Sequence, residues 1–255
     1  MSKSPTRPPI DETLDSLASL LSTLVIALFP LTFIFETFVV PSSSMASTLL
    51  LGDHLLVERA TLGPRTEWAT FIAYRDILRG EPIVFYKPVP EPDGEHIILV
   101  KRVIGVPGDR VHLRRGILYL NGFEQVEPRA AKPAAANYDP YRDDFPAIPP
   151  ANIPGVTAQW SLDLPAHTRG LDLVVPPDCF FVMGDNRPHS LDGRYWGFVP
   201  RANLIGRPLF IYWSFETSEG QIEAKSLPDK ISFTLYQFTH FFSETRWNRT
   251  LHAIN

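Results

Sequence analysis

Hydroxyl and amine side chains are the groups in this sequence best placed to do chemistry. Three consecutive serines, Ser42 to Ser44, follow Pro41, which favours an extended backbone. A serine hydroxyl is a weak nucleophile and needs an adjacent base. Lys101 stands alone in the apolar run from Ile97 to Val106, where burial would lower its pKa and let the neutral amine act as that base. Taken singly, a serine run is more typical of a turn or linker, and a strand lysine more often extends its ammonium group to water.

The sequence lacks the motifs of several other classes of catalytic site. The sequence has no G-x-S-x-G, H-E-x-x-H or S-x-x-K motif and no glycine-rich phosphate loop. Its histidines show no metal-ligand spacing, and Cys179, the single cysteine, lies in an apolar run and has no partner for an intramolecular disulfide. With 24 Lys and Arg against 28 Asp and Glu, the net charge is −4, which argues against a nucleic-acid partner because phosphate binding needs a basic excess.

The N-terminal region predicts a membrane anchor. Nineteen residues from Leu17 to Phe35 carry no charge, and at 1.5 Å per residue they would extend about 28 Å, close to the thickness of the bilayer core. The alternatives are a cleaved signal peptide, a buried core helix and a re-entrant segment. Lys3 and Arg7 precede the run and few positive charges follow it. The N-terminus is therefore predicted to be cytoplasmic, with everything after Glu36 outside.

The rest of the chain favours β structure, because its 25 prolines disfavour helix interiors. Short apolar runs bounded by turn signals predict strands at 54–59, 82–86, 96–106, 179–183 and 209–215. A hairpin is predicted over 109–122, around Arg114 to Gly116.

Two later regions interrupt the pattern. Residues 123–170 are rich in proline and alanine and predict a loop-rich insertion. The tail from Ser232 to Trp247 has Leu235, Phe238 and Phe242 at helical spacing. This tail predicts a helix that docks on the domain or contacts the membrane interface. The predicted division is a cytoplasmic tail (1–16), an anchor (17–36), a β domain in two parts (37–122 and 171–216), the insertion (123–170) and a C-terminal tail (217–255).

Together these features resemble the type I signal peptidases, membrane-anchored serine proteases that remove signal peptides from exported proteins with a Ser/Lys dyad. The resemblance lies in four boxes in the family's order: Pro41–Met45 with Thr48-Leu49 and Gly52-Asp53, Lys101–Asp109, Tyr119–Gly122, and Gly184–Arg187 with Ser190, Asp192 and Arg194–Gly197. Two residues depart from it. Ser47 replaces the usual proline, which predicts a looser loop after the nucleophile, and His189 replaces the usual asparagine.

The resemblance implies a role for each matching residue. Ser44 would be the nucleophile and Lys101 the general base, Ser190 would hydrogen-bond the Lys101 amine, and the Ser42 hydroxyl with the Ser44 N–H would hold the oxyanion. Ionic support of the site would come from Arg102, Asp185, Asp192 and Arg194, which could otherwise be ordinary surface pairs. Pockets for small substrate side chains would be lined by Phe38, Val40, Met45, Leu55, Leu99 and Val100.

The implied protein is mainly β: a single transmembrane helix followed by an antiparallel β-sheet catalytic domain with an inserted loop-rich region. It would lie in the bacterial inner membrane with the catalytic domain on the outer side. It would cut exported preproteins after small-x-small sites. Its partners would be signal peptides and the lipid bilayer. No metal or organic cofactor is implied, and the oligomeric state stays open.

Two other functions compete. A related Ser/Lys peptidase could process itself or one dedicated partner. Alternatively, the chain could be an inactive, membrane-tethered β-rich binding module in which the serine run is only a linker.

Overall fold

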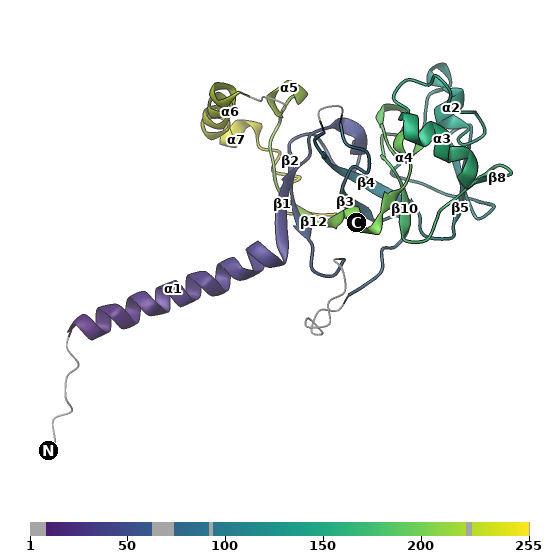
Figure 1. The fold of residues 1–255 in the computed structure, drawn as a ribbon. Helices are drawn as coiled ribbons and strands as arrows, with labels where there is room; N and C mark the ends of the chain where they lie inside the picture. Colours follow the sequence, from purple (N-terminus) through teal and green to yellow (C-terminus); the bar gives the residue numbers. More distant parts are fainter. Residues whose placement is uncertain (1–8, 63–73, 92–93, 223–225, 255) are drawn as a thin grey trace.

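A long N-terminal helix leads into two antiparallel sheets (Figure 1). The computed structural model describes residues 9–62, 74–91, 94–222 and 226–254. Helix α1 (Pro9–Phe33) projects away from the sheets, and strand β1 (Phe35–Val39) begins just after it. Lys3 and Arg7, on which the predicted orientation depends, lie outside the described residues.

The predicted anchor differs in its bounds from the helix that forms. Phe35, predicted as the last residue of the span, already lies in β1. The reason is pairing: Phe35 to Val39 are hydrogen-bonded to β2 in antiparallel register, with Phe38 opposite Leu55. In the part of the chain that the structure describes, no helix combines the length and apolarity needed to cross a bilayer.

The larger sheet has the order β1-β2-β12-β3-β4-β10-β11, with β13 also paired to β12. Its strands after β1 are β2 (Asp53–Glu58), β3 (Pro82–Tyr86), β4 (Ile98–Gly105), β10 (Cys179–Met183), β11 (Val199–Pro200), β12 (Leu204–Ser214) and β13 (His252–Ala253). All of its pairings are antiparallel. All five strands predicted from the apolar runs are therefore confirmed and lie in this one sheet.

The smaller sheet has the order β7-β6-β5-β9-β8. Its strands are β5 (Arg110–Arg114), β6 (Ile117–Leu120), β7 (Phe123–Glu124), β8 (Thr168–Arg169) and β9 (Asp172–Val174). The predicted hairpin is confirmed as β5 and β6, with Arg114 opposite Ile117. Between them Arg115 and Gly116 have φ angles of 52° and 75°, the left-handed conformation that two-residue hairpin turns require.

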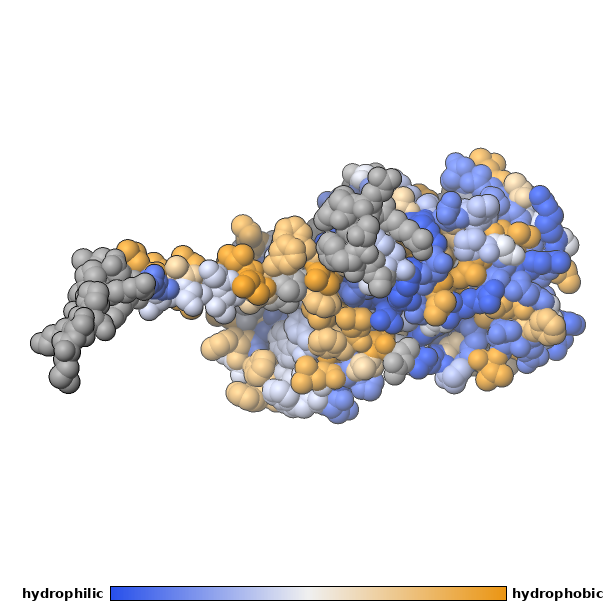
Figure 2. All heavy atoms as spheres, turned by 90° about the horizontal axis from the view of Figure 1, so that it is seen from below, coloured by the Kyte–Doolittle hydropathy of each residue, from blue (hydrophilic) through white to orange (hydrophobic). Residues whose placement is uncertain are grey.

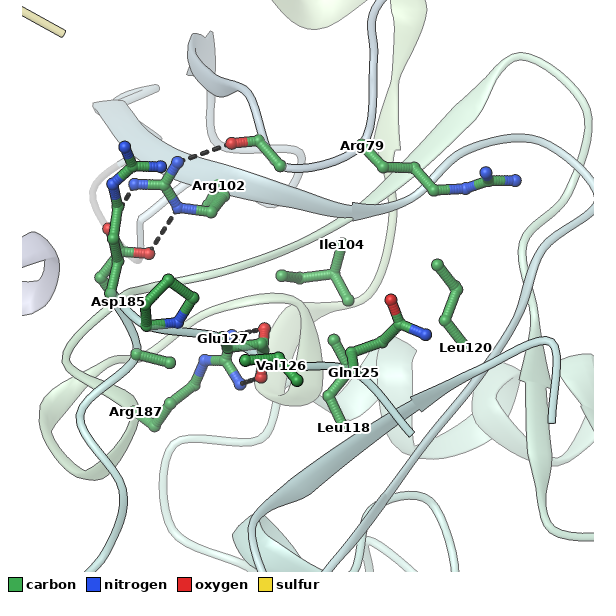
Figure 3. A pocket seen from close by; sticks show the side chains of 14 residues that line it. Arg79, Arg102, Ile104, Leu118, Leu120, Gln125, Val126, Glu127, Asp185 and Arg187 are labelled. Carbon is green, nitrogen blue, oxygen red and sulfur yellow. Dashed lines mark hydrogen bonds and ion pairs between the residues drawn. The ribbon is translucent and has the colours of Figure 1, made fainter. Parts of the chain in front are cut away.

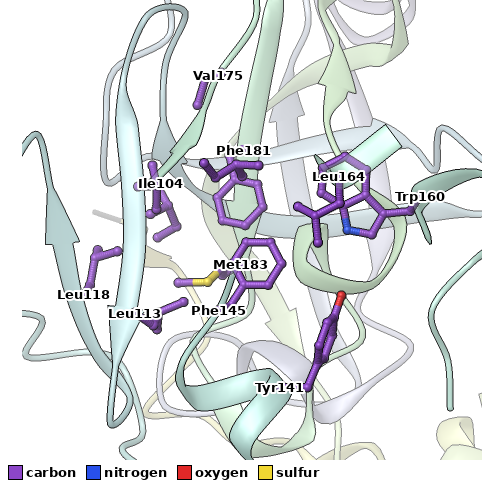
Figure 4. Close-up of a cluster of buried hydrophobic side chains, with 12 residues drawn as sticks. Ile104, Leu113, Leu118, Tyr141, Phe145, Trp160, Leu164, Val175, Phe181 and Met183 are labelled. Atoms are coloured by element: carbon purple, nitrogen blue, oxygen red, sulfur yellow. The ribbon is translucent and has the colours of Figure 1, made fainter. Parts of the chain in front are cut away.

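The segment predicted as a loop-rich insertion is more ordered than expected. It contains a short 3-10 helix η2 (Ala135–Asn137), α2 (Pro140–Asp143) and α3 (Ala158–His167), and its ends form β7 and β8. In α3, Trp160 and Leu164 are buried one turn apart and pack with Phe181 of β10 (Figure 4). An extended loop was the wrong expectation at 158–167. The sequence pattern did not predict this helix, because only these two of its residues are buried and because Pro165 lies within the helix.

The C-terminal tail forms the predicted helix in two pieces, α6 (Leu227–Thr239) and α7 (Phe241–Glu244), after the single turn α5 (Glu219–Ile222). One side docks on the end of β12: the rings of Phe233 and Tyr236 contact Phe215. The other side carries Phe238 and Phe242, which are 83% and 80% exposed.

In Figure 2, hydrophilic side chains are more frequent on the half of the domain far from α1.

Candidate active site

Ser44 lies in a single turn of 3-10 helix, η1 (Ser43–Met45), in the loop between β1 and β2. Ser42 precedes this turn in extended conformation, and the Ser44 side chain is buried. Lys101 comes from the middle of β4 and is only 2% exposed. Its amine donates a short hydrogen bond to Ser44 Oγ. The fold thus brings the candidate nucleophile and base into direct contact across 57 residues of sequence.

Burial controls the charge of this lysine. Loss of hydration lowers the pKa of Lys101 to about 8, because a low-dielectric surrounding disfavours the ammonium form. The Asp192 carboxylate acts in the opposite direction, and the Arg194 guanidinium again lowers the pKa. A substantial fraction of the amine is therefore neutral near pH 8, as a general base requires.

Asp192 and Arg194 form a completely buried ion pair beside the dyad, with both side chains 0% exposed. Arg194 Nε and Nη2 each donate to a different Asp192 oxygen at 2.8 Å. The backbone N–H of Gly184 donates to the same carboxylate at 3.0 Å. Burial alone would raise the pKa of Asp192, but Arg194, together with Lys101 and the Gly184 N–H, holds that pKa below its ordinary value.

A second buried pair ties the Lys101 strand to the nucleophile loop. Arg102 donates from Nε and Nη2 to the two Asp185 oxygens at 2.7 and 2.6 Å. Thr48 Oγ1 donates to the same carboxylate at 2.5 Å. All four charged residues predicted to support the site are thus buried beside it, so the interpretation as surface ion pairs is wrong.

Asn186 binds the nucleophile segment, and Gly184 lets it approach closely. The sequence motif contains both residues, but no role was predicted for either. Asn186 donates from its backbone N–H to Ser44 O at 3.0 Å and from Nδ2 to Ser43 O at 3.1 Å. A Cβ atom at Gly184 would lie 2.3 Å from Ser190 Oγ and 2.4 Å from Ser44 O. The motif signalled both residues, but only the packing shows why glycine is needed.

Of the two serines predicted to support the dyad, only Ser42 lies within hydrogen-bond distance of it. Ser42 Oγ lies 3.2 Å from Ser44 Oγ, within hydrogen-bond distance. Ser190 is buried close to the site, but its hydroxyl has no hydrogen-bond partner among the described residues. The predicted bond from Ser190 to the Lys101 amine is therefore not formed in this structure, where that amine bonds to Ser44 instead.

The predicted pocket residues fall into two groups, one at a cleft and one in an apolar cluster. Leu99 lines a cleft of about 360 Å³ together with Ser42, Ser44 and Lys101. Gly155 and Thr157 of the insertion, with His189 and Leu191, line the same cleft. The other predicted residues share one apolar cluster: Phe38, Val40, Met45, Leu55 and Val100.

The sequence pattern of one known protein family matches most of this chain. The sequence pattern of the family described as "Signal peptidase, peptidase S26" matches residues 13–213. The chain belongs to this family. The matched region includes both members of the dyad and both buried ion pairs. It ends before the C-terminal helices α6 and α7.

Several curated relatives carry the same family name. A probable signal peptidase I-2 from Synechocystis is 32% identical over 216 residues, which cover 83% of this chain and 78% of the relative. The signal peptidase I of Haemophilus influenzae is 29% identical over an alignment of 282 positions that covers 92% of this chain and 76% of the relative. A crystal structure of a signal peptidase I from Enterococcus faecalis is 29% identical, covers 52% of this chain and 97% of that one, and has a TM-score of 0.33.

Replacing the buried amine should stabilise the protein. The pKa of Lys101 is about 8 in the folded chain and about 10.4 in an unfolded one, so folding weakens proton binding. The resulting loss of stability is complete below about pH 8 and disappears as the pH rises towards about 10.4. We therefore expect Lys101→Met to raise the Tm at pH 7, by about 2–4 °C for each kcal/mol gained, and to lose much of that advantage at pH 10.

Thermal unfolding at the two pH values measures the effect. Lys132→Met, which removes an exposed lysine, is the matched control and should shift the Tm little at either pH. A Lys101→Met protein less stable than the parent at pH 7 would contradict the predicted cost of burial.

Proposed function

We propose that this member of the signal peptidase family is a membrane-bound serine endopeptidase that removes N-terminal signal peptides from exported preproteins with a Ser44/Lys101 dyad. The observation that carries the proposal is the contact between the buried Lys101 amine and Ser44 Oγ. A lysine whose pKa is lowered to about 8 by burial can take a proton at neutral to mildly alkaline pH.

In the first half of the reaction, neutral Lys101 accepts the Ser44 proton as Oγ attacks the scissile carbonyl carbon. The resulting tetrahedral intermediate collapses when Lys101 returns the proton to the leaving amine. The mature protein departs, and the signal peptide stays as an ester on Ser44. In the second half, Lys101 takes a proton from water as the water oxygen attacks the ester carbonyl, and then returns that proton to Ser44 Oγ as the bond to the signal peptide breaks.

The negative oxygen of the tetrahedral intermediate needs donors beside Ser44. The Ser44 N–H lies in the first turn of η1, where backbone N–H groups have no acceptor within the helix. The Ser42 hydroxyl, 3.2 Å from Ser44 Oγ, is the second donor in the proposed arrangement. Losing one donor of this kind typically costs about 10²–10³ in rate.

An extended substrate would bind between two strand edges. Strand β1 is the outer strand of the larger sheet. Among the described pairings, β10 joins β4 only from Arg102 onward, so Ile98 to Lys101 are paired on the β3 side alone. Open strand edges of this kind accept a peptide by β-strand addition. The apolar cluster of Phe38, Val40, Met45, Leu55 and Val100 would then limit the pockets to small side chains.

Helix α1 would be the membrane anchor. Its apolar side chains are exposed on every face, including Leu17, Leu20, Leu21, Leu24, Val25, Ile26, Leu28 and Phe29. A helix that is apolar all round is normally covered by protein or lipid. We place α1 across the bacterial inner membrane, with the N-terminus cytoplasmic and the catalytic domain on the outer side.

Mutation of either dyad member should abolish cleavage. Ser44→Ala removes the nucleophile and Lys101→Met removes the base, so each should lower kcat by about 10³ or more. The double variant should be no worse than either single one, because the pair acts as a unit. The assay is cleavage of a purified exported precursor with a small-x-small site, and Ser161→Ala, a serine of α3 outside the site, is the control.

The same assay separates the rival functions. An inactive binding module would cleave nothing under any condition. A dedicated processing enzyme would cut its own partner and leave unrelated precursors intact. Near-normal turnover by Lys101→Met would overturn the dyad.

The pH dependence should report the base. Because Lys101 must be neutral, kcat/KM should fall about tenfold per pH unit below its pKa, which burial lowers to about 8, and level off above it. His189 lines the same cleft, as do Lys87 and Glu91, and its substitution tests whether a group other than Lys101 sets the limb. An acid limb that moves in His189→Asn would assign the proton to the histidine instead.

Tethering should matter for membrane-inserted precursors more than for soluble peptides. A chain that begins at Ile34 keeps β1 whole and should cut a soluble peptide at the parental rate. It should process precursors in vesicles markedly more slowly, since it lacks the effective concentration that a shared bilayer provides. Equal rates on vesicles would contradict the anchoring role of α1. Replacing the exposed Phe238 and Phe242 by serine in the same background would then show whether the aromatic tail binds the membrane instead.

A further inference from the structure

The first part of the insertion forms a strap, residues 125–131, that passes behind the active site. It leaves β7 and runs over a cavity of about 350 Å³ (Figure 3). The floor of this cavity is apolar, with Ile104, Leu118 and Leu120, and its wall includes Arg102 and Asp185 of the ion pair described above. Val126 in the strap is 93% exposed, so apolar packing at this residue does not hold the strap in place.

Polar contacts tie the strap to the residues that follow β10. The Glu127 carboxylate pairs with both terminal nitrogens of Arg187, and the contact from Nη1 is 2.8 Å. The Arg187 side chain is 4% exposed, and a buried guanidinium needs an anionic partner. The backbone N–H of Ala131 donates to Asp185 O at 2.8 Å. The strap is thus fixed to the same short segment that supplies Asp185 and Asn186.

A further contact ties the strap to the nucleophile loop. Ser47 Oγ donates to Arg129 O at 2.7 Å. Ser47 has a φ of 90°, a conformation that is uncommon outside glycine and that proline cannot adopt, because its ring fixes φ near about −65°. The serine that was expected to loosen this loop instead connects it to the insertion.

The contacts of the strap reach the segments next to both Ser44 and Lys101. Ser47 is adjacent to Thr48, whose hydroxyl donates to Asp185, and Asp185 also binds Arg102, the neighbour of Lys101 on β4. Displacement of the strap would remove one tie to the Ser47 loop and one to the Asp185 backbone, while Asn186 and Arg249 keep their own bonds to the nucleophile loop. A segment that touches neither Ser44 Oγ nor Lys101 Nζ thus contributes to holding the loops beside them.

We propose that the strap is a positioning element for the proposed Ser44/Lys101 reaction, and that Glu127 and Ser47 are its positioning residues. The inference rests on the proposed function and assigns a role to the start of the insertion. Reacting groups displaced by about 1 Å can lose about 10²-fold in rate. The loss should appear in kcat, because neither residue lines the cleft that holds Ser44 and Lys101.

The test uses the full-length protein and a soluble peptide carrying a small-x-small site. Glu127→Gln and Ser47→Ala should each lower kcat by about 10-fold or more and leave KM within about twofold. The double variant should be no worse than the more damaging single one, because both residues act through the same strap. Glu124→Gln, which removes an exposed carboxylate three residues earlier, is the matched control and should behave as the parent protein does.

Ser47→Gly separates the hydrogen bond from the backbone conformation. Glycine tolerates the positive φ but lacks the hydroxyl, so kcat should fall as it does in Ser47→Ala. Full activity of the glycine variant would overturn the role of the tie. A lower Tm with unchanged kcat in Glu127→Gln would likewise overturn the proposal and leave the strap a purely structural element.

Failure of the Ser44/Lys101 dyad and failure of the strap's positioning role would give different results. If Ser44→Ala keeps its activity, the dyad itself is wrong. If Ser44→Ala is inactive while the strap variants match the parent in kcat, the dyad stands and the positioning role falls. If Glu127→Gln does not fold, Ser47→Gly still tests whether the strap positions the dyad, because it changes only an exposed side chain.

Discussion

Burial of one amine is the constraint on which the rest of this structure depends. Lys101 points from the middle of a β-strand into a site from which water is largely excluded, where the ammonium form is disfavoured. In the proposed reaction this energetic penalty has a use, because the amine lies within bonding distance of Ser44 Oγ. Stability and reactivity are therefore opposed at this position, as they often are where a fold holds a reactive group.

The surrounding charges serve this arrangement by cancelling one another. Asp192 faces Arg194 and Asp185 faces Arg102, and both pairs are buried with matched geometry. A single unpaired carboxylate here would favour the ammonium form, raise the pKa of Lys101 and leave little neutral amine near neutral pH. Pairing each acid with an arginine lets these residues fix backbone segments, through Gly184 N–H and the Thr48 hydroxyl, while limiting their effect on the lysine.

Much of the architecture could be predicted from the sequence because its signals are local. Apolar runs ended by turn residues marked the strands of the larger sheet, and Arg115-Gly116 marked a hairpin whose turn needs positive φ. The catalytic boxes were recognisable because Ser44 and Lys101 sit in motifs of unusual composition. Helix α3 was missed because its burial depends on contacts of Trp160 and Leu164 with a distant strand, which no periodicity within the segment reveals.

The orientation of individual side chains was harder to predict. Ser190 was expected to bond to Lys101, but the amine bonds to Ser44, and the Ser190 hydroxyl has no partner among the described residues. The consequence of Ser47 was likewise invisible, because its partner, the Arg129 carbonyl, is 82 residues away. The sequence shows which groups are available, and the fold decides which of them meet.

Strand β4 changes neighbours at the base itself. From Arg102 onward it is paired on both sides, and up to Lys101 one edge is open. A peptide laid along that edge would continue β10's place in the sheet and end beside the serine. Recognition by main-chain hydrogen bonds is indifferent to most side chains, so in the proposed binding mode one site could serve many unrelated sequences that share only an extended backbone and two small residues. The substrate would then act as a missing strand, and cutting it would restore the gap for the next one.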